Sequence, residues 1–218
     1  MRIFATADFH GNAEAFRKTA LKAKQSHANV VVVCGDVTHF GSLQQAKKLL
    51  SLLSISCPVL FVPGNLDPPT LTDEEIETVE SIHGKCKRIN NINFIGIGGS
   101  SPCPFYTPFE LTEAEIASVL EQSFNICKTK QKTVLVSHSP PKNTRVDIAF
   151  TGDHVGSSSI TKFIEEKKPI LVLCGHIHEA TGIDRINDTI VVNPGPAKHR
   201  HCAVIDLNGN INVKLERL

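Results

Sequence analysis

Tryptophan is absent from the 218-residue chain, tyrosine and methionine occur once each, and neither sign of charge is in clear excess. Lys and Arg number 23 against 22 for Asp and Glu, so the formal net charge is +1. Proteins that gather nucleic acid or anionic lipid carry a marked basic excess, and those that hold single strands add interleaved aromatic residues. We therefore do not expect an extended nucleic acid as partner, and recognition has to come from a local site.

Long apolar runs are also missing, and no segment approaches the length that crosses a bilayer. The first apolar stretch meets Asp8 too soon to form a signal peptide. The seven cysteines are odd in number, widely scattered and without a Cys-x-x-Cys pair, which argues against a disulfide framework and a structural zinc site. We expect a reduced, cytoplasmic protein with no membrane association.

Strands and helices alternate in the first part of the chain, which is typical of parallel β-sheets. A hydrophobic content of 41% is enough for one sizeable core, and we expect a single domain over residues 1–218. We predict strands at residues 2–7, 30–34 and 59–62, with helices at 13–25 and 43–53 between them.

The second part repeats this pattern and then changes to consecutive strands. We predict strands at residues 92–96, 132–137 and 170–174, and helices at 112–125 and 157–167. Thr112 and Glu115 have the spacing of a capping box, and Ser157 is a candidate N-cap. Four strands follow at 181–186, 189–192, 202–207 and 211–215, with Asn208-Gly209 as a hairpin turn. The elements predict mixed sheets with helices on the outside.

Polar side chains follow five of the predicted strands at the point where each strand ends. In open α/β sheets ligands bind at the carboxyl ends of the strands, so groups that are distant in sequence can meet there. Residues two apart on an extended segment also face the same way, which lets both members of Asp8-x-His10 approach one cation. The five groups are Asp8-x-His10, Gly35-Asp36, Gly64-Asn65, His138 and Gly175-His176-x-His178.

The donor types in these groups point to transition metals. Imidazole nitrogens mixed with carboxylate and amide oxygens suit manganese, iron, zinc, cobalt or nickel better than calcium or magnesium. A lone histidine after a strand is usually an ordinary turn or core residue, whereas three histidines at strand ends indicate a shared role. We expect two divalent ions, with manganese favoured.

Asp-x-His, Gly-Asp, Gly-Asn-x-Asp, His and Gly-His-x-His occur in this order over residues 8–178. Together they resemble the calcineurin-like metallophosphoesterase family, in particular its small bacterial and archaeal phosphodiesterase-type members. The resemblance implies an α/β fold, a four-layer α/β/β/α sandwich of two mixed sheets flanked by helices. It further implies that a hydroxide bridging the two metals hydrolyses a phosphate ester. The metal ligands that it implies are Asp8, His10 and His178 for one ion, Asn65, His138 and His176 for the other, and Asp36 as the bridge.

One position departs from the family pattern. Where the usual motif has a histidine that assists the leaving group, this chain has Leu66, which can neither donate a proton nor stabilise negative charge. Family members that lack this histidine are associated mainly with phosphodiesters, so we expect a phosphodiesterase rather than a monoesterase. Asn65, His39 and His154 are the candidates for substrate contact or for the proton donor.

One alternative function stays open. A retromer subunit with a similar fold also has leucine after Gly-Asn, so a weakly active or inactive scaffold is the alternative function. Such scaffolds have lost imidazole ligands that this chain retains at His10, His138, His176 and His178. A homo-oligomer is compatible with the sequence, and the substrate is expected to be a phosphorylated small molecule or a diester.

Overall fold

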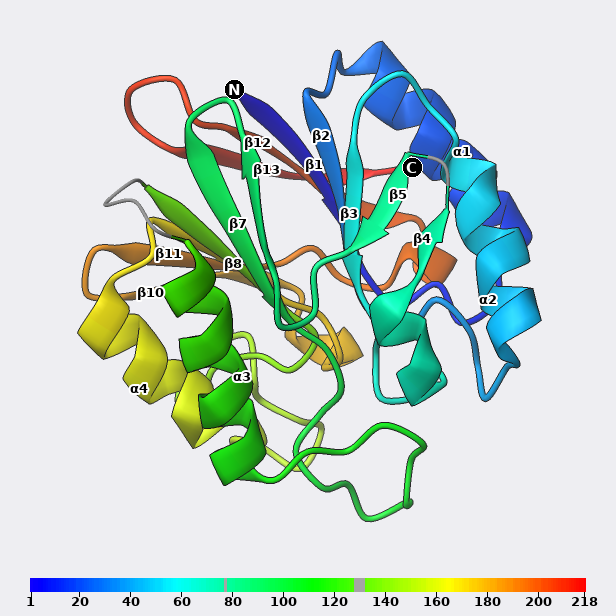
Figure 1. Cartoon of the computed structure of the whole chain (residues 1–218). Helices are drawn as coiled ribbons and strands as arrows, with labels where there is room; N and C mark the ends of the chain where they lie inside the picture. Colours follow the sequence, from blue (N-terminus) through cyan, green and yellow to red (C-terminus); the bar gives the residue numbers. More distant parts are fainter. Residues whose placement is uncertain (77, 128–131) are drawn as a thin grey trace.

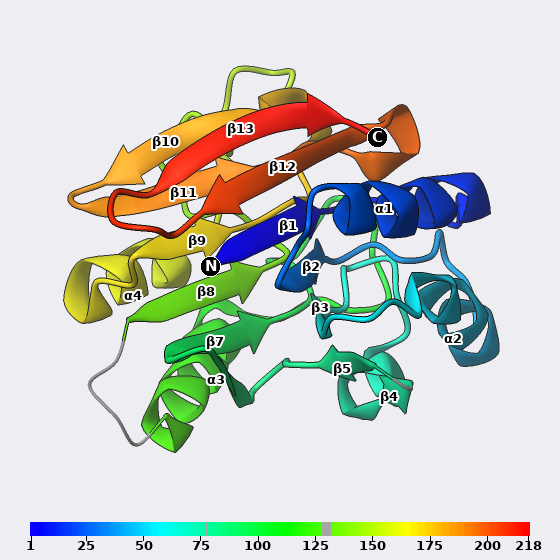
Figure 2. The ribbon, with the colours of Figure 1, turned by 90° about the horizontal axis from the view of Figure 1, so that it is seen from above.

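Two mixed β-sheets pack face to face and carry helices on their outer faces (Figures 1 and 2). The computed structural model describes residues 1–76, 78–127 and 132–218. Figure 2 shows the molecule from above, with α1 and α2 beside one sheet and α3 and α4 beside the other. The predicted four-layer α/β/β/α sandwich is thus confirmed.

The first sheet has seven strands in the order β13-β12-β1-β2-β3-β5-β4. Its central strands β1, β2, β3 and β5 run parallel, whereas β12, β13 and β4 pair antiparallel. The parallel arrangement brings the ends of the central strands to one edge. The strands are β1 (Arg2–Thr6), β2 (Val30–Cys34), β3 (Val59–Val62), β4 (Glu75–Ile76), β5 (Val79–Ser81), β12 (His201–Asp206) and β13 (Asn212–Arg217).

The second sheet has six strands in the order β10-β11-β9-β8-β7-β6. Strands β7, β8, β9 and β11 are parallel, and the outer strands β6 and β10 are antiparallel to their neighbours. The strands are β6 (Cys86–Ile89), β7 (Ile92–Ile97), β8 (Thr133–Ser137), β9 (Leu171–Leu173), β10 (Gly182–Ile186) and β11 (Thr189–Asn193).

Four α-helices begin at side chains that cap them. These are α1 (Ala13–Gln25), α2 (Leu43–Leu50), α3 (Glu113–Ile126) and α4 (Ser158–Lys167), with Asn12, Ser42, Thr112 and Ser157 as N-caps. The capping box of Thr112 and Glu115 is present as predicted. Within the described ranges, none of the helices is long and apolar enough to cross a membrane.

Strand alternation divides the apolar residues among three cores. On β2, Val30, Val32 and Cys34 belong to the core between the sheets, whereas Val31 and Val33 pack with residues of α1 and α2. A third core lies between the second sheet and helices α3 and α4. A strand that is buried on both faces has an uninterrupted apolar sequence. The sequence of β2, Val-Val-Val-Val-Cys, is such a run, and all five residues are buried.

Most predicted elements match the structure within two residues, but three short strands were missed. β4, β5 and β6 are two to four residues long and contain charged residues, so they lack the apolar alternation that marks a strand. The predicted helix at 43–53 ends at Leu50 and continues as a 3-10 turn, Ser51–Leu53. The hairpin turn at Asn208-Gly209 is confirmed between β12 and β13.

The prediction that the cysteines stay unpaired is wrong for two of them. Cys86 on β6 and Cys127 at the end of α3 form a disulfide, with their Cα atoms 5.7 Å apart. They are 41 residues apart in sequence, and only the packing of α3 on the second sheet brings them together. Cys34 and Cys174 are buried and free.

Candidate metal centre

The polar groups predicted at strand ends come together at the carboxyl edge of the parallel strands. The loops after β1 and β2 are tied by the amide of Asp8, which donates to the carbonyl of Gly35 at 3.0 Å. The amide of Gly175 after β9 donates in the same way to the carbonyl of His138 after β8, also at 3.0 Å. Backbone hydrogen bonds therefore fix neighbouring loops against each other before any side chain contributes.

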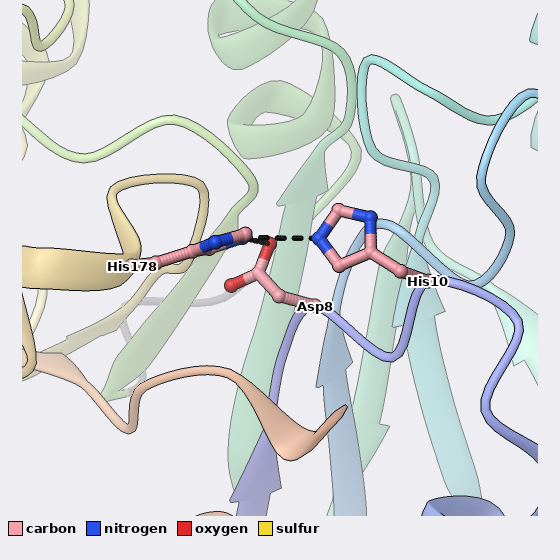
Figure 3. Close-up of side chains that lie close together, drawn as sticks. All are labelled: Asp8, His10 and His178. Atoms are coloured by element: carbon pink, nitrogen blue, oxygen red, sulfur yellow. Dashed lines mark hydrogen bonds and ion pairs between the residues drawn. The ribbon is translucent and has the colours of Figure 1, made fainter. Parts of the chain in front are cut away.

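Asp8, His10 and His178 form one half of the centre, and Figure 3 shows both rings turned toward each other above the carboxylate. The Nε2 atoms of His10 and His178 are 3.0 Å apart. Nε2 of His178 lies 3.6 Å from Oδ1 of Asp8. One ligand atom from each residue lies within 4.8 Å of the others, which is the spacing that a single cation needs.

Asp8, Asp36 and His138 form the second group of the same kind, and all three side chains are buried. Oδ1 of Asp36 lies 3.6 Å from Nε2 of His138, and Oδ2 lies 3.7 Å from Nε2 of His10. The two oxygens of Asp36 thus face the two halves. Asn65 adds its Oδ1, which is 2.9 Å from Nε2 of His138.

His176 lies beside the second group but belongs to neither of the two groups. Its ring centroid is 4.9 Å from that of His138, and its amide donates to the Asp8 carboxylate at 3.2 Å. Nε2 of His176 is also 3.9 Å from Sγ of Cys103. Cys103 therefore adjoins the centre, although its position in the sequence gave no sign of this.

Four of the seven predicted ligands have a left-handed backbone. The φ angles are 57° for Asp8, 48° for His10, 51° for Asp36 and 70° for His176. Residues other than glycine adopt this region rarely, and the cost is on the order of 1 kcal/mol or more each. Such a concentration of strain marks a functional site, because the surrounding structure has to hold each side chain in place.

Burial sets the protonation of the histidines. It lowers the pKa of His10 and of His176, each to about 3, so both rings are neutral near physiological pH and keep a lone pair free. Burial would raise the pKa of Asp8, but the interactions with His178, His138 and His10 hold it below its usual value. Neutral imidazoles beside an ionised carboxylate form a donor set ready for a cation.

Asp36 shows the opposite shift. Burial, together with the negative charges of Asp67 and Asp8, raises the pKa of Asp36 well above its usual value. Carboxylates crowded in this way ionise together only when positive charge balances them. An ionised Asp36 in these surroundings therefore requires a positive charge close by.

The hydrogen bonding of His138 and Asn65 also fits divalent ions. Nδ1 of His138 donates to the carbonyl of Cys34 at 2.8 Å, so its Nε2 carries the lone pair that faces Oδ1 of Asn65. Two acceptors this close repel each other unless a cation lies between them. The residues present thus fit a metal centre of mixed nitrogen and oxygen ligands.

Asp67 is a structural residue of the site to which the sequence assigned no role. Its buried carboxylate accepts hydrogen bonds from the amides of Val37, Thr38 and Gly64 at 3.0, 2.7 and 2.9 Å, and from Oγ1 of Thr38 at 2.8 Å. It therefore ties the loop that carries Asp36 to the loop that carries Asn65. The signal in the sequence was an acid two residues after Asn65.

The other candidate residues lie in different places. The His39 ring packs edge-on against His10, with centroids 5.6 Å apart, so His39 adjoins the centre. Nδ1 of His154 donates to the buried Asp147 at 2.6 Å, which fixes this ring within the loop before α4. Leu66 is half-buried, and its amide donates to Oδ1 of Asp36 at 3.0 Å.

The chain is similar to known proteins over most of its length. Residues 1–209 match the family model described as the calcineurin-like phosphoesterase superfamily domain. The uncharacterised protein MJ1162 of Methanocaldococcus jannaschii is 44% identical over 203 residues, which covers 91% of this chain and 90% of that protein.

Solved structures share the fold at low sequence identity. TT1561 of Thermus thermophilus matches with a TM-score of 0.78 and 17% identity, over 99% of this chain and 98% of that one. A dimetal phosphatase from Danio rerio gives 0.67 and 13%, over 100% and 96%. An archaeal phosphodiesterase gives 0.58 and 15%, over 99% and 100%. At these identities the likeness shows the fold alone.

Proposed function

We propose, from the premise that this chain belongs to the calcineurin-like phosphoesterase superfamily, that it is a two-metal phosphoesterase which prefers phosphodiesters. The observation that carries the proposal is the convergence of Asp8, His10, Asp36, His138 and His178 within ligand distance at one edge of the strands.

Asp8, His10 and His178 would hold one ion, and Asn65, His138 and His176 the other, with Asp36 between them. Two bound divalent ions would supply positive charge for the phosphoryl oxygens and a bridging hydroxide as nucleophile. Manganese is the favoured metal. The protein keeps the imidazoles neutral through burial and holds the ligand loops in register through Asp67. A nucleophile from the protein is then unnecessary.

The preference for diesters rests on Leu66. Its amide donates to Oδ1 of Asp36 at 3.0 Å, and it occupies the position at which the family motif has a histidine. An aliphatic side chain supplies neither a proton nor a positive charge, so esters with poor leaving groups are disfavoured. His39, which packs against His10, is the remaining candidate donor beside the centre. The archaeal phosphodiesterase that shares the fold is consistent with diester chemistry.

The donor set also favours an enzyme over a scaffold. Asp8, Asp36 and His138 are buried together, and a protein that bound no cation would gain nothing from keeping them so. A structure described as an anchor in the inner membrane complex of Plasmodium shares the fold with a TM-score of 0.63 and 16% identity, so the fold also occurs in a structural role.

Metal analysis of the purified chain, combined with hydrolysis of matched aryl monoesters and diesters, tests the proposal. We expect about two ions per chain and metal-dependent turnover that is faster on the diester. Asp36→Asn is the control and should lose both. Bound metal without turnover on any phosphate ester would favour the scaffold, and failure to bind any divalent ion would refute the metal centre.

A further inference from the structure

The exposed aromatic residues of this protein are confined to one edge. Of eleven phenylalanines and one tyrosine, four are exposed: Phe40 at 55%, Phe105 at 83%, Tyr106 at 91% and Phe150 at 90%. The other eight are buried or half-buried. The four lie in the loops after β2, β7 and β8, which leave the sheets at the edge that carries the metal centre. We call these four residues the aromatic rim.

Each of the three loops contacts a residue of the metal centre or a residue directly beside one. The Phe40 ring packs edge-on against His39, whose ring packs against His10, with centroid distances of 5.2 and 5.6 Å. The amide of Phe150 donates at 2.8 Å to the carboxylate of Glu179, the residue after His178.

The third loop carries two members of the rim. Sγ of Cys103 lies 3.9 Å from Nε2 of His176, and Phe105 and Tyr106 follow two and three residues later. In Figure 1 this green loop between β7 and α3 projects beyond the edge at which the strands end. The loop that carries Phe105 and Tyr106 therefore begins beside the metal centre and extends away from it toward solvent.

The charge of these loops limits what they can bind. The loops after β2 and β7 contain no lysine or arginine, and the loop after β8 carries Lys142 and Arg145 before residue 146 and none from there to residue 157. The charged residues within 101–111 and 146–157 are Glu110, Asp147 and Asp153. A nucleic-acid strand or an anionic membrane would require basic residues around the aromatic side chains. An uncharged planar ring requires only apolar faces and edges on which to stack.

We propose that the aromatic rim binds the planar ring of a small phosphodiester, with a nucleobase as the biological example, while the phosphate lies at the metal centre. The proposal rests on the proposed function for the position of the phosphate. It adds the substrate class: a diester of nucleotide size in which the group beyond the phosphate is aromatic. The rim then determines specificity and leaves the chemistry to the centre.

Diesters with a common leaving group isolate this effect. We would compare the p-nitrophenyl diester of thymidine monophosphate with methyl p-nitrophenyl phosphate, because the reacting bond is the same in both. The ratio of their kcat/KM values should fall by about fivefold or more in Phe105→Ala or Phe150→Ala, since one stacked ring contributes that much or more. Leu21→Ala, an exposed apolar residue on α1, is the matched control and should leave the ratio unchanged.

The single tyrosine provides a second measurement that needs no turnover. Because the chain has no tryptophan, its intrinsic fluorescence comes from Tyr106 alone. Adenosine monophosphate should change this fluorescence in a saturable way, whereas ribose phosphate at equal concentration should not. Phe105→Ala should weaken the change and Leu21→Ala should not.

The outcomes separate the rim from the catalytic centre. An unchanged ratio of kcat/KM values in both rim variants, or an equal loss on both esters, would overturn the rim. Saturable quenching by adenosine monophosphate without any turnover would support the rim and count against the proposed function. Turnover without quenching would keep the phosphoesterase and overturn the rim. Phe105-dependent binding to lipid vesicles, or Phe105-dependent dimers, without quenching would likewise overturn it.

Discussion

A Cβ atom on Gly64 would lie 2.1 Å from Oδ1 of Asp36 and 2.2 Å from its backbone nitrogen. Atoms cannot approach this closely, so only glycine at position 64 permits the observed place of Asp36 between the two halves of the centre. The loop after β3 thus touches the loop after β2 at its most crowded point. The requirement for glycine comes from the neighbouring loop and not from the turn in which Gly64 lies.

Replacing Gly64 by alanine should therefore displace Asp36. We expect Gly64→Ala to fold, as judged by circular dichroism, but to lose about tenfold or more in metal affinity, as is common when a residue that positions a metal ligand is changed. Isothermal titration with Mn²⁺ measures this. Gly182→Ala is the control, because a Cβ there meets its neighbours only at 3.9 Å. Equal metal affinity in the two variants would contradict the role of the Gly64 contact.

Asp67 should contribute to stability and to site geometry together. In Asp67→Asn the NH₂ group would face backbone amides that now donate to a carboxylate oxygen. Leaving buried donors unpaired costs about 1–3 kcal/mol, and we expect a loss of that size in the free energy of unfolding in urea. The exposed Asp188→Asn is the control. A stability equal to that of the wild type would show that the loops do not depend on this carboxylate.

Leu66 should limit monoester hydrolysis. We expect Leu66→His to raise kcat on p-nitrophenyl phosphate by about tenfold or more relative to bis(p-nitrophenyl) phosphate, because general acid catalysis commonly contributes factors of about 100 or more when fully aligned. Leu66→Gln, which adds a polar group of similar size without an acid of suitable pKa, is the control. If the ratio of the two rates stays constant in Leu66→His, the diester preference has another cause.

His83 should make stability depend on pH. Burial lowers its pKa to about 4 from a usual 6.5, and its Nδ1 accepts the amide of Gly98 at 2.9 Å, so the ring is part of the packed structure. Between about pH 6.5 and 4 the unfolded chain binds a proton here that the folded chain does not. The stabilisation is thus complete above pH 6.5 and is lost as the pH falls through this window.

The variant His83→Asn separates this effect from other titrations, because its Oδ1 can accept from Gly98 and does not titrate. The free energy of unfolding, measured with chelator present, should fall less steeply with decreasing pH than in the wild type, by at most about 1.4 kcal/mol per pH unit. Identical slopes would show that His83 is accessible to protons in the folded state.

The disulfide predicts the number of free thiols in the chain. Thiol titration of the unfolded chain without reductant should give five free cysteines, and seven after reduction. Replacing Cys86 and Cys127 together by serine should lower the free energy of unfolding by about 2–4 kcal/mol, because the bridge closes a long loop of the unfolded chain. Cys57→Ser leaves the bridge intact and is the control. Seven free thiols before reduction would rule out the bridge.

Much of the fold followed from local pattern. Apolar runs of β-branched residues, capping residues such as Thr112 and Ser157, and the Asn208-Gly209 turn act within a few positions of the chain, so their effect can be read without the fold. Strands β4, β5 and β6 could not be predicted in this way, because they are short and are held by their neighbours in the sheet.

The sequence by itself determined which residues meet, since ligand groups that end parallel strands must reach one edge, and Asp8, His10 and His178 do so. Only the tertiary structure decided what surrounds them. The contact of Gly64 with Asp36, the hydrogen bonds to Asp67 and the pairing of Cys86 with Cys127 join segments distant along the chain. Such contacts form only when whole layers pack together, so they cannot be predicted from any short stretch of the sequence.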